Sequence, residues 1–369
     1  MTKICFIVNT VINAGPVNVI YDIVSNIDRN TFEPIIWALK DNVEYRSRVK
    51  DFENLGIKVH FFNFSFLKME LQTKKCSSIL DNLIKKENIR IVHLHGYHPV
   101  LIATHLKSNV KKITTIHNLC YEDYVQKKGL LIGNYMGKRF CNNLKYMDAC
   151  VAITEYMKDY YKKYCNNRIS VIYNGINAQT FSACSNAEKK NLRIKYGFPE
   201  SIIIYVACNS LNKRKNTIAL ISAANKLNDN NKLFLIAGDG PEENNLKQAA
   251  NNNPNIIFLG RQKNVIPILQ LSDFYITTSK SEGCPLAPLE AISCGLTTIY
   301  SNISAHKELF YSHKELQPYM FKLDVKDDLY LKIKSSSPIE NIQNVANYFK
   351  ENFSSRKMSE KYQELYSLM

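Results

Sequence analysis

The chain has 369 residues, of which 45% are hydrophobic and 22% are charged. A single hydrophobic core rarely grows beyond about 250–300 residues, so this length predicts two domains with sizeable cores. No apolar run approaches the roughly 18 residues that a membrane-spanning helix needs. The ten cysteines form no C-x-x-C pair and no cluster with histidine. This pattern disfavours a disulfide framework or a zinc site and indicates reduced thiols in a cytoplasmic protein.

The net charge is +15, and residues 1–174 carry +10 of it. A solvated basic surface would account for this excess. So would an anionic membrane face, phosphate-bearing ligands or nucleic acid as a partner.

The first half of the chain alternates short apolar runs with longer amphipathic ones. Its start superficially resembles a signal peptide, but Asn9, Asn13 and Asn18 interrupt the apolar run, so we predict a buried strand over 3–8. The other strands predicted in this half cover 34–39, 58–64, 89–96, 112–118, 149–154 and 169–175. Helices are predicted over 17–27 and 76–87.

A polar segment, 173–190, interrupts the alternation, and a second series of elements follows it. The strands predicted there cover 201–208, 232–240, 255–260, 274–279 and 297–302. The helices cover 217–228, 243–250, 286–294 and 354–369. Near-continuous apolar strands separated by helices are typical of parallel sheets covered on both faces. We therefore predict an α/β fold with two doubly wound domains. Since such sheets bind ligands at the carboxyl ends of their strands, the cleft between the domains is the expected site.

The segment SEGCPLAPLEA, residues 281–291, holds two acids, two prolines and a glycine between a predicted strand and a predicted helix. Pro288 is tolerated in the first turn of a helix, and Gly283 lets the backbone approach a ligand closely. The N-terminus of the helix favours an anion. Glu290, further along the helix, can accept hydrogen bonds from a ligand diol. The segment thus indicates a binding site for a ligand with both an anion and hydroxyls.

Glu282-x7-Glu290 resembles the E-x7-E motif of the family 4 retaining glycosyltransferases, which have the GT-B fold of two Rossmann-like domains facing across a cleft. The segments VIYNGINAQTF (171–181), NSLNKRKN (209–216), LIAGDGPE (235–242) and IIFLGR (256–261) resemble further motifs in the family's order, and 353–366 resembles its terminal helix. The resemblance implies an acceptor-binding domain over 1–172, on which the helix 354–369 packs, and a nucleotide-sugar-binding domain over 173–353.

The resemblance also implies roles for single residues. Glu282 would hold hydroxyls of the donor sugar, Glu290 the ribose, and Lys215 the diphosphate. The other donor-binding residues that it implies are Asn209, Ser210 and Arg261, with the backbone at Gly283, Cys284, Pro285 and Leu286. The family often has an arginine where this chain has Ser210, and Arg214 or Lys213 is a candidate to replace its charge.

In the first domain, the resemblance places His117 beside the transferring sugar and counts it, with Glu282 and Lys215, among the catalytic residues. Gly15 matches the glycine-rich first loop, although the usual second glycine and acid are absent here. His93, His95 and His98 suggest a metal, but no acid or cysteine lies near them in sequence, so a lining near the acceptor is favoured. With no D-x-D motif either, no metal ion and no other cofactor is expected.

Residues 125–147 mix basic and large apolar side chains. This pattern is typical of a segment at a membrane surface and also of a core helix with basic flanks. Because the first domain is basic, a lipid-linked acceptor and a peripheral position on the inner face of the plasma membrane fit the first interpretation.

The predicted function is transfer of a hexosyl or N-acetylhexosaminyl group, with retention, from a nucleotide diphosphate sugar, with UDP favoured. The acceptor would be a glycan hydroxyl in the synthesis of O-antigen, capsule or another surface polysaccharide. The abundance of Asn, Lys and Ile, which hints at an AT-rich gene, is compatible with such a bacterial locus. Two alternatives stay open: a nucleotide-sugar epimerase or hydrolase of the same fold, and a basic nucleic-acid-binding protein.

Overall fold

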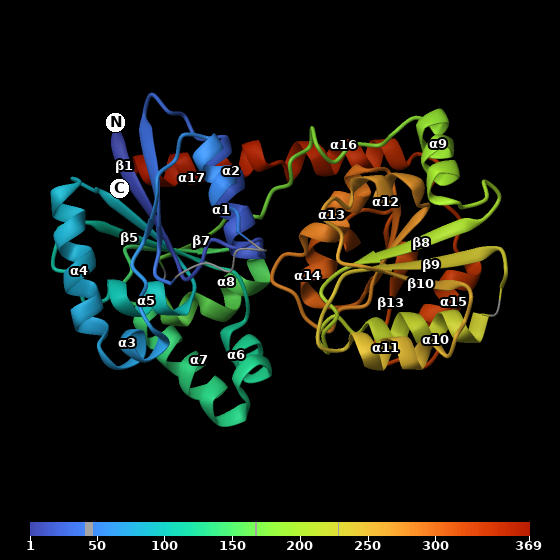
Figure 1. The fold of residues 1–369 in the computed structure, drawn as a ribbon, viewed down its shortest axis with the longest axis horizontal. Coiled ribbons are helices and arrows are strands. Elements are labelled where there is room, and N and C mark those ends of the chain that lie inside the picture. Colours follow the sequence, from blue (N-terminus) through green and yellow to red (C-terminus); the bar gives the residue numbers. More distant parts are fainter. Residues whose placement is uncertain (41–46, 167, 228) are drawn as a thin grey trace. The chain divides into compact units, whose positions relative to one another are not determined.

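The structure is a computed structural model that describes residues 1–40, 47–166, 168–227 and 229–369. The chain separates into two compact units. The first consists of Met1–Gly175 and Ser355–Met369, and the second of Ile176–Ser354. Figure 1 shows both units, each with its own sheet and helices. The predicted domains, 1–172 with 354–369 and 173–353, have bounds a few residues away from these.

The first unit is built on a parallel sheet with the strand order β3-β2-β1-β4-β5-β6-β7. The strands are β1 (Thr2–Val8), β2 (Phe32–Ala38), β3 (Val59–Phe61), β4 (Ile91–His95), β5 (Lys111–Ile116), β6 (Ala149–Ala152) and β7 (Ile169–Val171). The register of the central pair aligns Ile4 with Ile91 and Val8 with His95. Residues Ile4, Cys5, Phe6 and Ile7 of β1 are fully buried, because helices cover both faces of the sheet.

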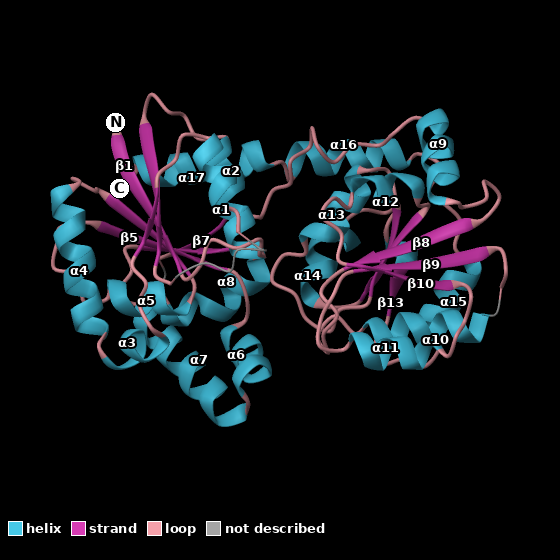
Figure 2. Cartoon of the chain, in the orientation of Figure 1, coloured by secondary structure: helices cyan, strands magenta, loops and turns pink. Residues whose placement is uncertain are grey.

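The helices of the first unit fill the connections between these strands (Figure 2). They are α1 (Gly15–Ser25), α2 (Val49–Asn54), α3 (Phe66–Leu71), α4 (Thr73–Lys86), α5 (Tyr97–Ala103), α6 (Cys120–Lys128), α7 (Leu130–Leu144), α8 (Glu155–Tyr161) and, from the end of the chain, α17 (Ser355–Ser367). Helix α17 packs against α1. Its buried Tyr362 and Tyr366 hydrogen-bond Thr115 at 2.8 Å and His93 at 2.7 Å, which ties the terminal helix to the centre of the sheet.

The second unit repeats this plan with the order β10-β9-β8-β11-β12-β13. Its strands are β8 (Ile203–Cys208), β9 (Lys232–Ala237), β10 (Ile256–Gly260), β11 (Phe274–Thr277), β12 (Thr297–Ser301) and β13 (Met320–Phe321). Its α-helices are α9 (Asn186–Tyr196), α10 (Thr217–Leu227), α11 (Glu243–Ala250), α12 (Ile266–Leu271), α13 (Leu286–Ser293), α14 (Ser304–His306), α15 (Asp328–Ser335) and α16 (Ile342–Asn352).

Each predicted strand is confirmed, although most end one to four residues earlier than predicted. Strand β13 was not predicted, because two residues carry no periodic signal. The predicted basic–apolar segment 125–147 is interrupted at Gly129, whose φ of 81° separates α6 from α7. The last residue of the predicted helix 217–228 lies outside the described residues. None of the described helices is long and apolar enough to cross a membrane.

Both sheets reverse their strand order next to the first strand, between β1 and β4 and between β8 and β11. Open parallel sheets bind ligands at the carboxyl ends of the strands on either side of such a reversal. The order of the strands therefore marks one candidate site in each unit.

Candidate active site

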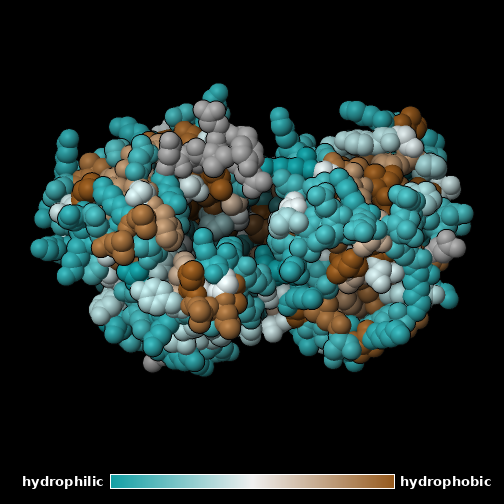
Figure 3. Space-filling view, turned by 60° about the horizontal axis from the view of Figure 1, so that its bottom comes forward, coloured by the Kyte–Doolittle hydropathy of each residue, from teal (hydrophilic) through white to brown (hydrophobic). Residues whose placement is uncertain are grey.

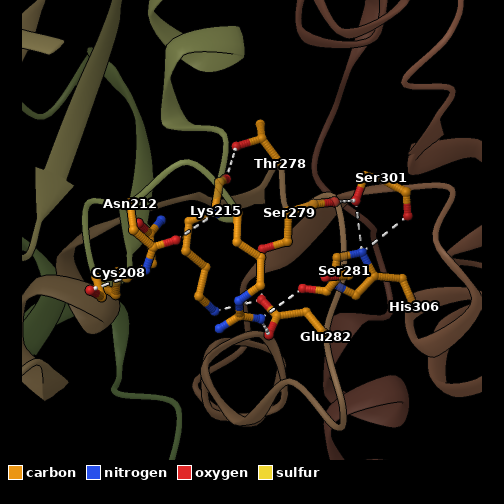
Figure 4. Close-up of polar contacts among 12 residues, drawn as sticks. Cys208, Asn212, Lys215, Thr278, Ser279, Ser281, Glu282, Ser301 and His306 are labelled. Carbon is orange, nitrogen blue, oxygen red and sulfur yellow. Dashed lines mark hydrogen bonds and ion pairs between the residues drawn. The ribbon is translucent and has the colours of Figure 1, made fainter. Parts of the chain in front are cut away.

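In the second unit, the loop that follows β11 holds Glu282 between two cations (Figure 4). The Lys215 Nζ donates to Glu282 Oε1 at 2.5 Å and the Arg214 Nη1 to Oε2 at 2.6 Å. The Ser279 hydroxyl also donates to Oε1, at 2.6 Å. Only 7% of the Glu282 side chain is exposed. One carboxylate and two cations give this cluster a net positive charge, which suits an anionic ligand.

The ionisation of Glu282 follows from these contacts. Burial alone would raise the pKa of its carboxyl, but Lys215 and Arg214 outweigh burial and lower the pKa to about 2. Glu282 is therefore an ion throughout the physiological pH range. It can accept hydrogen bonds from ligand hydroxyls but has no proton to donate.

Helix α13 begins at Leu286, four residues after Glu282, and no side chain caps its first turn. Pro285 is its N-cap, and its first turn contains no acid. Pro288, the third residue of the helix, has no N–H to leave unpaired. Gly283, Cys284 and Pro285 are buried, so the turn is held in place by packing. The uncapped end adds a partial positive charge beside the two cations.

The loop that carries Lys215, residues 209–216, is fixed from two sides. The Lys215 amide donates to Asn212 Oδ1 at 3.1 Å, and Thr278 Oγ1 donates to the Lys215 carbonyl at 2.9 Å. On the other side the loop touches two glycines of the β9–α11 turn. A Cβ added at Gly238 would lie 1.8 Å from the Asn209 carbonyl oxygen, and one at Gly240 would lie 2.4 Å from that of Leu211.

The family often has an arginine at the position of Ser210, and Arg214 and Lys213 were the candidates to replace its charge. Of these two, Arg214 lies at the site. Its guanidinium contacts both Glu282 and the Ser281 carbonyl, the latter at 2.7 Å. Lys213 is exposed, and so is Ser210. Asn209 lies at the end of β8, where its Oδ1 accepts from Thr217 Oγ1 at 3.3 Å.

The other predicted donor-binding residues of this unit lie at the same edge of the sheet. Glu290 is half-buried on α13. Burial raises the pKa of Cys208, at the end of β8, to about 12, and the negative charge of Glu290 has the next largest effect. Glu290 therefore lies near the end of β8. Arg261 is exposed directly after β10, the edge strand, and no described contact joins it to Glu282.

Behind the loop that carries Glu282 lie two further hydrogen bonds that the sequence did not predict. Ser301 Oγ donates to the Ser279 carbonyl at 2.7 Å, and the buried His306 Nδ1 lies 3.0 Å from Ser301 Oγ. Burial lowers the pKa of His306 to about 4, so the ring is neutral. Residues 301 and 306 come from β12 and α14, and only folding brings them behind Glu282 (Figure 4).

In the first unit, the carboxyl ends of β1, β4 and β5 surround a cavity of about 440 Å³. His117 lines this cavity, and its Nε2 lies 2.8 Å from His95 Nδ1. Burial lowers the pKa of His117 to about 4. Gly15 lies at the start of α1, next to the lining residues Ala14 and Pro16. A Cβ added there would meet no atom within 4 Å, so packing within the chain does not require this glycine.

The three histidines of the β4 segment do not share one environment. His93 is buried under α17, where Tyr366 and Thr115 engage both ring nitrogens. His95 and His98 line the cavity, and His98 Nε2 lies 3.0 Å from Glu70 Oε1. Among the described residues no group of three or more His, Cys, Asp or Glu side chains could hold a metal ion. Of the three histidines, His95 and His98 thus line the cavity and His93 does not.

Two family models match the chain, one over each half. The model described as Glycosyltransferase Family 4 matches residues 14–180, and the model described as Glycosyl transferases group 1 matches residues 188–351. Together they span most of the chain.

Curated relatives and solved structures agree with these matches. The O-antigen biosynthesis glycosyltransferase WclY of Escherichia coli is 26% identical over 99% of this chain and 98% of its own length. The UDP-Gal:alpha-D-GlcNAc-diphosphoundecaprenol alpha-1,3-galactosyltransferase of the same species is 29% identical over 73% of this chain and 75% of its own. The structure of Anabaena Alr3699/HepE in complex with UDP and glucose has a TM-score of 0.79 at 15% identity and covers all of both chains. That of a glycosyltransferase from Rickettsia africae has the same TM-score at 19% identity, covering 99% of this chain and 97% of its own. The chain therefore belongs to the family 4 glycosyltransferases and has their GT-B fold.

Proposed function

We propose that this glycosyltransferase moves a hexosyl or N-acetylhexosaminyl group, with retention, from a UDP-sugar to a hydroxyl of a lipid-linked glycan during synthesis of a bacterial surface polysaccharide. The observation that carries the proposal is the cluster of Glu282, Lys215 and Arg214 at the switch point of the second sheet. The relative that acts from UDP-Gal on a diphosphoundecaprenol-linked sugar supports the donor and the acceptor, and the UDP-bound neighbour supports the nucleotide.

The cluster suits a reaction in which the leaving diphosphate gains negative charge. Lys215, Arg214 and the uncapped amides at the start of α13 supply positive charge without reorganisation. On this basis we propose that no metal ion and no cofactor are needed. Glu282 is held by three donors and stays ionised, so it would orient sugar hydroxyls. We propose a front-face route, in which the acceptor hydroxyl attacks the anomeric carbon on the side from which the diphosphate departs, and the departing phosphate oxygen takes the proton of that hydroxyl.

Each of the other predicted site residues would bind a different part of the donor. Glu290 would bind the ribose hydroxyls, while Asn209 and Ser210 would donate to the diphosphate, with Arg261 at its margin. In the first unit, His117 would lie beside the transferring sugar and Gly15 beside the diphosphate, where the space in front of Gly15 leaves room for a ligand.

We also propose that the first unit binds the membrane surface through the tip formed by α6 and α7. The exposed fractions of Leu130, Leu131, Ile132 and Tyr135 are 67%, 86%, 57% and 60%. Lys127, Lys128 and Lys138 lie among them and are exposed too. Figure 3 shows brown side chains gathered over this tip and over α3. Apolar side chains flanked by lysines favour an anionic bilayer.

Vesicles test this surface directly. Sedimentation with phosphatidylglycerol vesicles should carry the wild-type protein down and leave most of L131E/I132E in solution. Equal sedimentation of both proteins would refute the surface. The control K334A, at an exposed basic side chain on α15 of the second unit, should behave as wild type.

Transfer is tested with membranes that contain the lipid-linked acceptor and a panel of labelled nucleotide sugars. One UDP-sugar should label the lipid fraction, and Lys215→Ala or Glu290→Ala should slow labelling at least about a hundredfold, the scale of losing preorganised electrostatic contacts. Near-normal labelling by either variant would refute the site. Incubation with the donor alone distinguishes a glycosyltransferase from an epimerase or hydrolase, because only the latter two would change the sugar without an acceptor.

A further inference from the structure

A series of buried hydrogen bonds leads from His306 to Glu282 in the second unit (Figure 4). Ser279 Oγ donates to Glu282 Oε1 at 2.6 Å, and the Ser301 hydroxyl donates to the Ser279 carbonyl at 2.7 Å. His306 Nδ1 lies 3.0 Å from Ser301 Oγ. Ser279 is 1% exposed, and Ser301 and His306 are completely buried. Because water does not reach these groups, each hydrogen bond of the series helps to determine the orientation of the next group.

Two acceptors determine which nitrogen of His306 carries the proton. Nδ1 lies 3.0 Å from the Ser301 carbonyl oxygen and 3.0 Å from Ser301 Oγ. A carbonyl oxygen cannot donate, and the one hydrogen of the Ser301 hydroxyl is directed at Ser279, so Nδ1 is the donor to both atoms. Because burial lowers the pKa of His306 to about 4, the ring is neutral and Nε2 holds a lone pair. Among the described residues this Nε2 has no hydrogen-bond partner. The polar contacts that the structure describes for the ring are therefore those of Nδ1 with Ser301.

Aromatic packing keeps the His306 ring in this orientation. His306 ends α14, and the chain continues in a turn of π-helix, Lys307–Tyr311. The ring centres of Phe310, in this turn, and Tyr300, on β12, lie 5.8 Å and 6.2 Å from that of His306. One fixed N–H that bonds both the main chain and the side chain of Ser301 holds this side chain in one rotamer. The hydroxyl of Ser301 is thereby directed at the next group of the series.

A different set of contacts holds the two cations of the site. The Lys280 amide donates to the Arg214 carbonyl at 2.8 Å, and Thr278 Oγ1 donates to the Lys215 carbonyl at 2.9 Å. These bonds involve neither the two serines nor the histidine. Loss of the histidine contact should therefore disturb the carboxylate, which would face the sugar, more than the cations, which would face the diphosphate.

We infer that His306 is a positioning residue that, through the two serines, holds the Glu282 carboxylate in place for the hydroxyls of the donor sugar. The serines come from the loop after β11 and from β12, and the histidine comes from α14. The role therefore depends on folding and not on a sequence motif. Any side chain that places an N–H where Nδ1 stands should fulfil it. This inference rests on the proposed function, since it concerns the same donor, and adds to it a residue behind the site.

The test compares transfer of the sugar with binding of the nucleotide. Initial rates of transfer at a saturating UDP-sugar give kcat, and calorimetric titration of the whole protein with UDP gives Kd. His306→Phe keeps an aromatic ring and removes the donor, whereas His306→Asn places its side-chain N–H where Nδ1 stands. The matched control is His313→Asn, which removes a histidine of the same unit that packs on Tyr348 and Phe349. Melting temperatures of the free variants check that each one folds, and Ser301→Ala tests the same series of bonds if His306→Phe does not fold.

His306→Phe should lower kcat about tenfold, the scale of one lost hydrogen bond, and leave the Kd of UDP within about threefold. His306→Asn should keep kcat within about threefold of wild type, and the control should match wild type. Ser301→Ala should also lower kcat about tenfold, and S301A/H306F should lower it no further, because the two residues act in one series of bonds. In ¹⁵N NMR spectra of the histidine rings, His306 should be neutral with its proton on Nδ1.

Equal kcat values for His306→Phe and wild type would overturn the inference, and so would losses that multiply to about a hundredfold in S301A/H306F. A parallel loss of UDP binding and kcat that asparagine does not rescue would overturn it by showing a purely structural role. A proton on Nε2 in the NMR spectra would also overturn it. Absence of transfer by wild type would refute the proposed function, and this inference with it, whereas wild type is active in each of the other outcomes.

Discussion

The contact between His95 and His117 determines which proton His117 can offer. His95 Nδ1 lies 2.8 Å from His117 Nε2, and His95 Nε2 is buried without a partner. A buried N–H without an acceptor costs more than a buried lone pair, so the proton of His95 belongs on Nδ1. His117 Nε2 then accepts a hydrogen bond from His95 Nδ1–H, so the N–H of the neutral His117 ring is on Nδ1. His95 thereby orients the His117 ring, and at the position proposed above for the transferring sugar His117 Nδ1 would be the donor.

This assignment predicts opposite results for two amides at position 95. The side-chain nitrogen of asparagine can stand where His95 Nδ1 stands, whereas that of glutamine reaches the position of Nε2. His95→Asn should therefore keep kcat within about threefold of wild type, and His95→Gln should lower it at least about tenfold, the effect of losing one positioning hydrogen bond. Steady-state kinetics would measure this split, and equal kcat values for the two variants would refute the tautomer.

Arg214 gives a second prediction at this scale. Its contact with Glu282 is a charge-assisted bond of 2.6 Å in a mostly buried place. Arg214→Ala should weaken UDP binding about tenfold, because one of the two cations beside the diphosphate is lost. Lys213→Ala is the control, because it also removes one positive charge but from the neighbouring, exposed side chain. It should change the affinity for UDP less than twofold. Calorimetry with both variants tests the assignment, which fails if Lys213→Ala has the larger effect.

At the scale of elements, the β8–α10 loop owes its shape to the β9–α11 turn. Gly238 and Gly240 have φ values of 148° and 158°, and their missing Cβ atoms leave room for the carbonyls of Asn209 and Leu211. The Leu211 amide donates to the Asp239 carbonyl at 2.8 Å, which joins the two turns. These two glycines therefore help to place Lys215, although neither of them contacts Glu282.

Gly238→Ala should consequently destabilise the protein by on the order of 2–4 kcal/mol, from the overpacked contact and the strained φ. It should also weaken UDP binding by displacing the loop. Gly15→Ala is the control, since its Cβ meets nothing and its φ is ordinary, and it should leave the free energy of unfolding unchanged. Denaturant titrations of both variants decide the matter, and equal stability of the two would contradict this account of the turn.

The sequence was sufficient for the strands because their apolar runs are nearly continuous, and for the E-x7-E loop because Pro288 and the acids have fixed spacings. It was insufficient where contacts join distant residues. Nothing in the sequence couples His306 to Ser279, or Glu70 to His98 and Arg139. The choice between Lys213 and Arg214 depended on which side chain of the loop faces inward. Only the structure shows this, because the Arg214 guanidinium contacts Ser281 and Glu282 and the Arg214 carbonyl accepts from the Lys280 amide at 2.8 Å.

Across the whole molecule, several histidines are buried in the neutral state. His93 and His306 are completely buried. Burial lowers the pKa of His93 to about 3, with a smaller effect of His117, and lowers that of His306 to about 4. Below pH 6.5 the unfolded chain therefore binds protons that the folded chain does not bind. Stability is complete above pH 6.5 and falls as the pH drops toward the folded pKa values.

The free energy of unfolding should hence fall between pH 6.5 and pH 5, a window in which most carboxylates are still ionised. Each buried histidine contributes up to about 2 kcal/mol over this range, from about 1.4 kcal/mol per pH unit. Trp37, the only tryptophan in the sequence, is buried in β2 and reports the first unit by fluorescence. A denaturation midpoint that does not change over this window would contradict neutral burial of His93.

The central claim is that the second unit binds the diphosphate of a UDP-sugar at Lys215, Arg214 and the start of α13. The most direct measurement is the melting temperature of wild type and Lys215→Ala with UDP, GDP or ADP present. A ligand at about 100 times its Kd stabilises the folded state by about 2.7 kcal/mol. We predict a rise of several degrees for wild type with UDP and little or none for Lys215→Ala. A response confined to GDP, or an equal rise in both proteins, would contradict the claim.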